Sequence, residues 1–200
     1  MQHWSDQQLF SALGKGEKEA LSVLFLRYHS YLLHYGQHIV SDRVLVEESI
    51  QELFIHLFEK QDHSREIKNV EAYLFRSLRN RLLRHIQREQ RMKNNELQWI
   101  GGIKNSFSEE DIRFDELKDS NVREILLEAL NSLPWRQKEA VYLRYYNGLN
   151  TREIAEVMGT ANQTVLNTLH QALKRIRNFQ KLKKFVGYLF PWLLLYLFNL

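Results

Sequence analysis

The chain has 200 residues, of which 44% are apolar, 26% are charged and 12% are aromatic. This composition is typical of a folded protein, and the length allows one or two domains, which excludes large barrels and multidomain enzymes. Only 2 prolines and 8 glycines are present, too few turn residues for a many-stranded sheet, so we expect an all-α protein. The absence of cysteine excludes a disulfide scaffold and a thiol nucleophile, and it fits a reducing compartment such as the cytoplasm.

The charge of the chain is unevenly distributed, although its net value is only +4. Residues 76–93 hold seven lysines or arginines and one acid, and residues 174–184 hold six lysines or arginines and no acid. Two such segments are typical of a protein that binds a polyanion, either a nucleic acid or an anionic lipid surface.

Four helices are predicted in the first half of the chain. Ser5 caps a short helix over 6–13, and apolar residues recur every three or four positions over 21–39. A third helix follows Ser41 and Asp42 and buries the stripe between Ile50 and Phe58. The fourth, over 70–93, has an apolar face and an opposite basic face, which favours a rod that packs on one side and binds a polyanion on the other.

Residues 96–119 carry seven acids, three bases and no sustained apolar period, which predicts a mobile linker. Helices are expected again over 122–133, 136–146, 151–158 and 162–178. Asn150 and Glu153 form a capping box at the third of these, and Gly159 allows a turn before the fourth. The last two helices have the parts of a helix-turn-helix.

The second helix of this motif has an exposed face rich in amides and hydroxyls. Asparagine and glutamine can bind adenine edges, and threonine can contact a thymine methyl group. This face consists of Asn162, Gln163, Thr164, Asn167, Thr168 and Gln171. A structural hairpin with a solvated polar face is the alternative, since no Lys or Arg precedes Lys174 in this helix.

Both halves of the chain contain a set of short motifs. In the second half they are Leu133-Pro134, Ala140-Val141, Asn147-Gly148-Leu149, Glu153-Ile154-Ala155, Gly159, Thr164-Val165 and the run from Ala172 to Arg177. In the first half they are Glu47-Glu48, Gln51-Glu52-Leu53-Phe54, Ala72-Tyr73-Leu74-Phe75-Arg76 and Arg79-Asn80. Both sets resemble motifs of the sigma-70 family of bacterial RNA polymerase sigma factors. With two domains and a linker, the chain is similar to the small extracytoplasmic-function (ECF) sigma factors over about residues 6–179.

The resemblance implies a domain plan. Residues 1–95 would be a region 2 domain that binds core RNA polymerase and recognises and melts the upstream −10 element. Residues 96–119 would be the flexible acidic linker, and residues 120–180 a region 4 domain whose helix-turn-helix binds the −35 element. Residues 181–200 form an apolar tail without an assigned role.

The resemblance also implies roles for individual residues. The residues expected to bind polymerase are Glu48, Gln51, Glu52 and Ile55. Those expected to bind −10 DNA are Arg76, Arg79, Asn80, Arg81, Arg84 and Arg88. Those expected to bind −35 DNA are Arg152, Asn162, Gln163, Thr164, Asn167, Thr168, Gln171 and Lys174.

Three residues of the helix-turn-helix depart from the family pattern. Thr160 replaces an apolar turn residue, Ala161 replaces a capping serine, and Leu166 replaces a charged residue on the exposed face. These departures affect the sequence preference for the −35 element rather than the fold, and they predict that the second helix begins at Asn162. Ser49, where an aliphatic residue is usual, removes a little core area.

We find no catalytic constellation, no cofactor-binding motif and no metal site. His34 and His38 are four residues apart, but no acidic residue shares their face, so we interpret them as structural. We therefore expect no enzyme activity and no cofactor. The alternative function is a stand-alone helix-turn-helix regulator that binds duplex DNA without polymerase, and a third class is a peripheral membrane adaptor.

The tail, residues 181–200, is the main feature that the resemblance does not explain. Residues 185–200 carry no charge and follow three lysines, yet they are too short to span a membrane and contain Pro191. They could pack on the second domain or on a partner, or they could contact a membrane surface. We expect a cytoplasmic protein, since residues 1–13 have no signal-peptide pattern, with an anti-sigma factor as a further partner.

Overall fold

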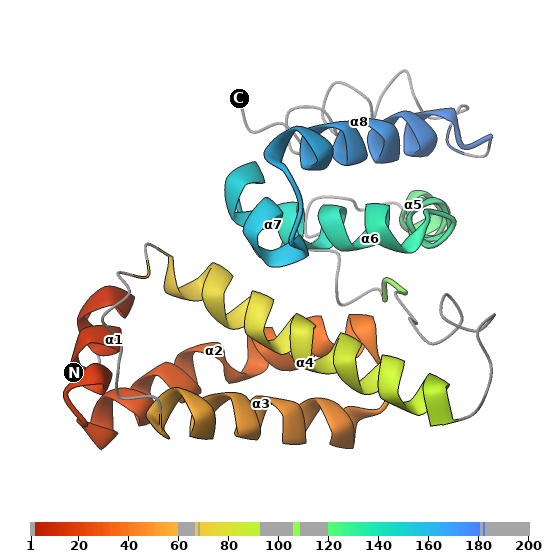
Figure 1. Cartoon of the computed structure of the whole chain (residues 1–200). Helices are drawn as coiled ribbons and strands as arrows, with labels where there is room; N and C mark the ends of the chain where they lie inside the picture. The colour runs from red at the N-terminus through yellow and green to blue at the C-terminus, as the bar shows by residue number, and fades with distance from the viewer. Residues whose placement is uncertain are drawn as a thin grey trace. The chain divides into compact units, whose positions relative to one another are not determined.

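The computed structural model of the chain describes residues 3–59, 67, 69–92, 106–108, 120–180 and 182. Within these ranges all regular structure is helical, which confirms the expected all-α class (Figure 1). Helices α1 to α4 belong to one unit of the chain, and α5, α6, η3, α8 and most of α7 belong to a second. None of the helices in the described ranges is both long and apolar enough to cross a membrane. The predicted linker lies outside these ranges except for residues 106–108, and the tail except for Leu182.

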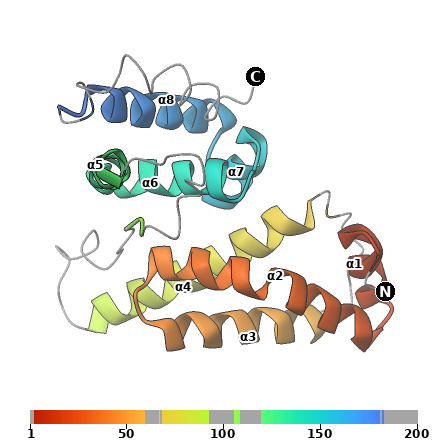
Figure 2. The same ribbon diagram turned by 180° about the vertical axis from the view of Figure 1, so that it is seen from behind.

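The first unit consists of α1 (Asp6–Gly14), α2 (Lys18–Ile39), α3 (Arg43–Glu59) and α4 (Val70–Met92). Helix α2 packs against the other three, and α3 and α4 also pack against each other, as the reverse view shows (Figure 2). The apolar stripes that the sequence predicted form the core between them: Leu24, Leu32, Ile50, Leu53, Phe75, Leu78 and Leu82 are buried. The amphipathic pattern therefore decided which face of each helix points inward.

Helices α1, α3 and α4 begin at polar side-chain caps, whereas α2 begins without a side-chain cap. Ser5 accepts a hydrogen bond from the Gln8 backbone at 3.3 Å, while the Gln8 side chain accepts one from the Ser5 backbone at 2.9 Å. Asp42 accepts hydrogen bonds from two backbone N–H groups at the start of α3, and Asn69 accepts one from Ala72 at 2.8 Å. These caps satisfy donors that a helix leaves without partners in its first turn.

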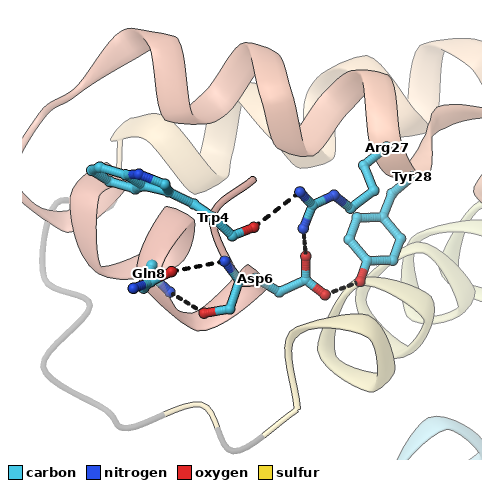
Figure 3. Close-up of polar contacts among 6 residues, drawn as sticks. Trp4, Asp6, Gln8, Arg27 and Tyr28 are labelled. Atoms are coloured by element: carbon cyan, nitrogen blue, oxygen red, sulfur yellow. Dashed lines mark hydrogen bonds and ion pairs between the residues drawn. The ribbon is translucent and has the colours of Figure 1, made fainter. Parts of the chain in front are cut away.

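Helix α1 is tied to α2 through the carboxylate of Asp6 (Figure 3). Arg27 donates to one oxygen of Asp6 and Tyr28 donates to the other. Arg27 also donates to the carbonyl oxygen of Trp4 at 3.0 Å. Burial, and next the hydrogen bond to Asp6, raise the pKa of the Tyr28 hydroxyl well above its usual value, so Tyr28 remains a donor across the physiological range.

The second unit contains α5 (Ser120–Asn131), α6 (Trp135–Val141), η3 (Tyr142–Tyr146), α7 (Thr151–Met158) and α8 (Asn162–Asn178). Helix α8 packs against α5 and α6 through the buried side chains Val165, Leu169, Ala172 and Ile176. These are the core residues that the sequence predicted for this helix, so the opposite face of α8 is exposed.

The helix predicted over 136–146 is present, but its second half is of a different type. From Tyr142 the chain forms a π turn, η3, in which the Asn147 N–H donates to the Tyr142 carbonyl at 3.3 Å. The rings of Tyr142 and Tyr146 stack with centroids 4.7 Å apart. Apolar periodicity indicates a helix but does not distinguish a bond over five residues from one over four, so the change was not visible in the sequence.

The prediction of a mobile linker is wrong for residues 106–108. Phe107 is buried, and its ring centroid lies 6.3 Å from that of Tyr142. Its backbone N–H donates to the side-chain oxygen of Asn131 at 2.7 Å, and its carbonyl accepts from the Asn131 amide nitrogen at 3.0 Å. The acidic composition around Phe107 concealed one aromatic side chain whose burial outweighs the cost of ordering a short segment.

We expect Tyr28→Phe to lower the free energy of unfolding by about 1–2 kcal/mol, because it removes only the hydrogen bond to the Asp6 carboxylate. Urea denaturation at neutral pH would measure the loss. The contribution falls above about pH 10, where tyrosine ionises in the unfolded chain but not at Tyr28 in the folded one. Tyr31→Phe is the matched control on the exposed side of α2 and should change stability by less than about 0.5 kcal/mol. Equal losses would contradict the role given to Asp6.

We expect Phe107→Ala to destabilise the second unit by roughly 3 kcal/mol, the usual cost of removing a buried phenylalanine. Thermal unfolding of the full chain, followed by circular dichroism, would show a lower melting temperature. Ser106→Ala changes an exposed neighbour and should leave the melting temperature unchanged. If the two variants had the same melting temperature, burial of Phe107 would not stabilise this unit.

Candidate functional site

The outward face of α3 combines acidic, amide and apolar side chains. Glu48, Gln51, Glu52 and Ile55 are all exposed, as the sequence predicted, whereas Ile50, Leu53 and Phe54 are buried on the opposite side. Ile55 is 56% exposed, and Val44, one turn before Glu48, is 63% exposed. Val44 was not among the residues predicted from the sequence, although its position four residues before Glu48 indicates the same face of the helix. An exposed stripe of apolar and acidic groups is suited to a protein partner.

The outward face of α4 is basic. Arg76, Asn80, Arg84 and Arg88 recur at intervals of four residues and are exposed. The Arg84 guanidinium donates to the Asn80 carbonyl at 3.0 Å, so its position along the helix is partly determined. Arginines spaced one turn apart can contact successive phosphates of a nucleic acid strand.

Arg79 does not belong to this surface, which corrects the sequence-based set. Its exposed fraction is only 8%, because it lies four residues after Phe75 and three before Leu82, both in the core. The family motif that suggested Arg79 contains no information on the direction of the side chain. A contact between Arg79 and DNA would require the arginine to leave the packed interior.

Glu52 on α3 and Arg81 on α4 form an ion pair. The Arg81 Nη1 lies 2.8 Å from the Glu52 Oε2, and its Nη2 donates to the Glu52 carbonyl at 3.4 Å. The sequence analysis assigned Glu52 to a protein interface and Arg81 to DNA. The structure brings them together, so a substitution at either residue disturbs both candidate surfaces.

The helix-turn-helix has the geometry that the sequence predicted. Asn150 accepts from the backbone of Arg152 and Glu153 at 3.0 and 3.1 Å, and Glu153 accepts from the Asn150 N–H at 2.7 Å. Gly159 has a φ of +64°, which only glycine adopts without strain, and it permits the turn between α7 and α8. Ala155 and Val165 are both buried, as expected for the crossing of the two helices.

The exposed face of α8 contains most of the residues predicted to bind −35 DNA. Asn162, Gln163, Thr164, Asn167, Gln171 and Lys174 are exposed, and so is Arg152 on α7. Thr168 is half-buried and donates to the Thr164 carbonyl at 2.7 Å, which leaves its hydroxyl oriented along the helix. The side chain of Gln163 donates to the Asn167 Oδ1 at 3.2 Å. Helix α8 begins at Asn162, as the substitution of Ala161 predicted.

Three further residues of α8 share this exposed surface. Leu166 is 43% exposed, and His170 and Arg175 are exposed as well. Leu166 was expected as a departure from the family pattern, whereas His170 and Arg175 were not among the residues predicted to bind −35 DNA. Their spacing of three or four residues from Asn167 and Gln171 was the available signal. Arg175 adds positive charge next to Lys174, where a phosphate backbone would pass.

The described part of the chain contains no cluster of three or more histidine, aspartate or glutamate side chains that could hold a metal ion. The candidate functional residues form three separate surfaces: the acidic and apolar face of α3 and the basic face of α4 in the first unit, and the polar face of α8 in the second. None of them is an enclosed catalytic centre. Their chemistry is that of binding to protein and nucleic acid.

Two family models match the chain in the order expected. Residues 24–92 match sigma-70 region 2, and residues 123–176 match sigma-70 region 4. Among curated proteins, the ECF RNA polymerase sigma factor SigL of Mycobacterium tuberculosis is 24% identical over 168 residues, which cover 84% of this chain and 92% of that protein. The ECF RNA polymerase sigma-E factor of Haemophilus influenzae is 25% identical over 179 residues, 87% of this chain and 94% of that one.

Solved structures share the fold. One is CnrH in complex with the cytosolic domain of CnrY, with a TM-score of 0.57 at 18% identity over 86% of this chain and 94% of that one. Another is the sigma factor RpoE in complex with the anti-sigma factor NepR from Bartonella quintana, with a TM-score of 0.56 at 22% identity over 78% and 94%. Because the region 2 and region 4 models together match more than half of the residues, and the two curated relatives described above are ECF factors that match over 92% and 94% of their length, this chain belongs to the sigma-70 family as an ECF sigma factor.

Proposed function

We propose that this sigma factor binds core RNA polymerase through α3 and directs transcription initiation at promoters whose −10 and −35 elements are contacted by α4 and α8. The observation that carries this function is the exposed acidic and apolar stripe of α3 in the same chain as a helix-turn-helix. A stand-alone regulator needs the second feature but not the first. The protein has no enzyme activity of its own in this proposal and acts in the cytoplasm.

The proposed domain boundaries follow the sequence analysis with one adjustment. Region 2 comprises residues 1–95 and region 4 residues 120–180, but the buried Phe107 extends the folded part of region 4 to residue 106. The spacer between the domains would then be residues 96–105. The membrane contact considered for residues 185–200 falls outside the described residues and gains no support from the fold.

The proposed DNA contacts on α4 are Arg76, Asn80, Arg84 and Arg88, which the structure exposes together. Arg79 is left out because it is buried, and Arg81 is a weaker candidate because Glu52 already binds its guanidinium. On α8 the proposed contacts are the exposed residues described above, together with Arg152.

We also propose that an anti-sigma protein regulates this chain. One structural relative is the sigma factor RpoE bound to the anti-sigma factor NepR, and another is CnrH bound to the cytosolic domain of CnrY. An anti-sigma protein that competes with polymerase would bind the exposed stripe on α3. By covering Glu48 and Ile55 it would prevent polymerase from binding, and transcription initiation would be blocked as a result.

Co-purification with bacterial core RNA polymerase tests the proposed function. We expect the wild-type chain to bind and Glu48→Lys to weaken binding about tenfold, which corresponds to ~1.4 kcal/mol. Glu48 is preferable to Glu52, whose substitution would also release Arg81. Glu124→Lys on α5 is the control, since it makes the same charge change at another exposed helical position.

The outcomes separate the alternatives. If the folded wild-type chain did not bind polymerase but bound duplex DNA, the stand-alone regulator would replace the sigma factor. If Glu48→Lys and Glu124→Lys weakened binding equally, the α3 face would not be the docking surface.

The salt dependence of promoter binding by the complex with polymerase tests the basic face of α4. We expect Arg84→Gln to lower the slope of log affinity against log salt by about one, the value for one lost phosphate contact. Arg81→Gln should lower it less, because Glu52 holds that guanidinium. An unchanged slope for Arg84→Gln would mean that this arginine is only solvated.

A further inference from the structure

We propose that Leu166 contacts the C5 methyl group of a thymine in the −35 element, next to an adenine that is bound jointly by Gln163 and Asn167. This inference rests on the proposed function of α8 as a DNA-reading helix and adds the base preference of that helix. Leu166 is an exposed leucine on a surface that is otherwise polar.

Leu166 lies outside the core of its unit. The other large apolar residues near it on α8, Val165 and Leu169, are at most 7% exposed, whereas Leu166 is 43% exposed. It follows Gln163 by three positions and precedes His170 by four, so it shares their outward surface. An exposed leucine gains free energy only when a partner removes it from water.

The chemistry around Leu166 indicates which partner covers it. Its neighbours on the surface carry amide and hydroxyl groups that suit base edges, and the second helix of a helix-turn-helix enters the major groove. The apolar group that the bases present in this groove is the thymine C5 methyl. A charged residue at this position would make a phosphate or guanine contact instead, so the leucine favours an A·T pair.

The amide pair beside Leu166 has a defined polarity. The Gln163 Nε2 donates to the Asn167 Oδ1 at 3.2 Å, which uses a donor of the first residue and an acceptor of the second. The Gln163 Oε1 and the Asn167 Nδ2 then present one acceptor and one donor on the exposed face. Adenine offers the complementary N6 donor and N7 acceptor, whereas guanine offers two acceptors and would oppose the Gln163 oxygen with its own O6.

Base analogues that lack a single chemical group test the thymine contact. Duplexes that bind the complex of this chain with core polymerase are first selected from a randomised pool. Each thymine in the selected −35 element is then replaced by deoxyuridine, which lacks only the C5 methyl. We expect one such replacement to weaken binding by wild type about fourfold, as for burial of one methyl group. The same replacement should change binding by Leu166→Ala very little.

The matched variant is Gln163→Ala, which should bind more weakly than wild type but keep the full effect of deoxyuridine. Replacement of adenine by 7-deazaadenine removes the N7 acceptor and should weaken wild type but not Asn167→Ala. Alanine favours helix at both exposed positions, and circular dichroism of the variants checks that α8 is intact.

The results distinguish this inference from the proposed function. If the complex selects no sequence, the proposed function fails. If it selects a −35 element but no deoxyuridine weakens wild type, or the loss persists in Leu166→Ala, the thymine contact is wrong and the function stands. If Leu166→Ala instead weakens binding to core polymerase in the absence of DNA, Leu166 belongs to a protein interface and the inference is overturned.

Discussion

The burial of one face of α4 is the constraint on which the arrangement of the first unit depends. Phe75, Leu78 and Leu82 are fully buried, and α4 packs against α1, α2 and α3. Because a helix turns by about 100° per residue, this packing determines the direction of the arginines between Arg76 and Arg88 on α4. It turns Arg76 and Arg84 toward solvent and Arg79 into the interior. The core packing of α4 therefore decides which arginines form the basic face. The positions of the arginines in the sequence do not by themselves show which of them are exposed.

The ion pair between Glu52 and Arg81 joins two surfaces that have different proposed partners. An exposed pair of this kind contributes little to stability, typically below about 1 kcal/mol, because water and salt screen it. The ion pair matters for function instead, because polymerase and Arg81 would compete for the Glu52 carboxylate. Residues without this double role, such as Glu48 and Arg84, report on each surface separately.

The second unit shows how a short segment changes a domain boundary. Phe107 and Asn131 exchange two hydrogen bonds, and the buried ring packs near Tyr142, which begins the π turn. The folded unit thus begins before α5. The packing of α8 against α5 and α6 through its buried side chains then leaves exposed the opposite face, which carries Leu166, Gln163 and Asn167.

The sequence by itself determined the all-α class, the order of the helices, most of their ends and the identity of the helix-turn-helix. These features follow from local rules: apolar periodicity, caps such as Ser5 and Asn150, and turn residues such as Gly159. Only the tertiary structure decided that Arg79 is buried, that Arg81 is paired with Glu52 and that Phe107 is anchored. Each of these depends on groups distant in the chain or on the exact rotation of a helix against its neighbours, which short-range patterns do not encode.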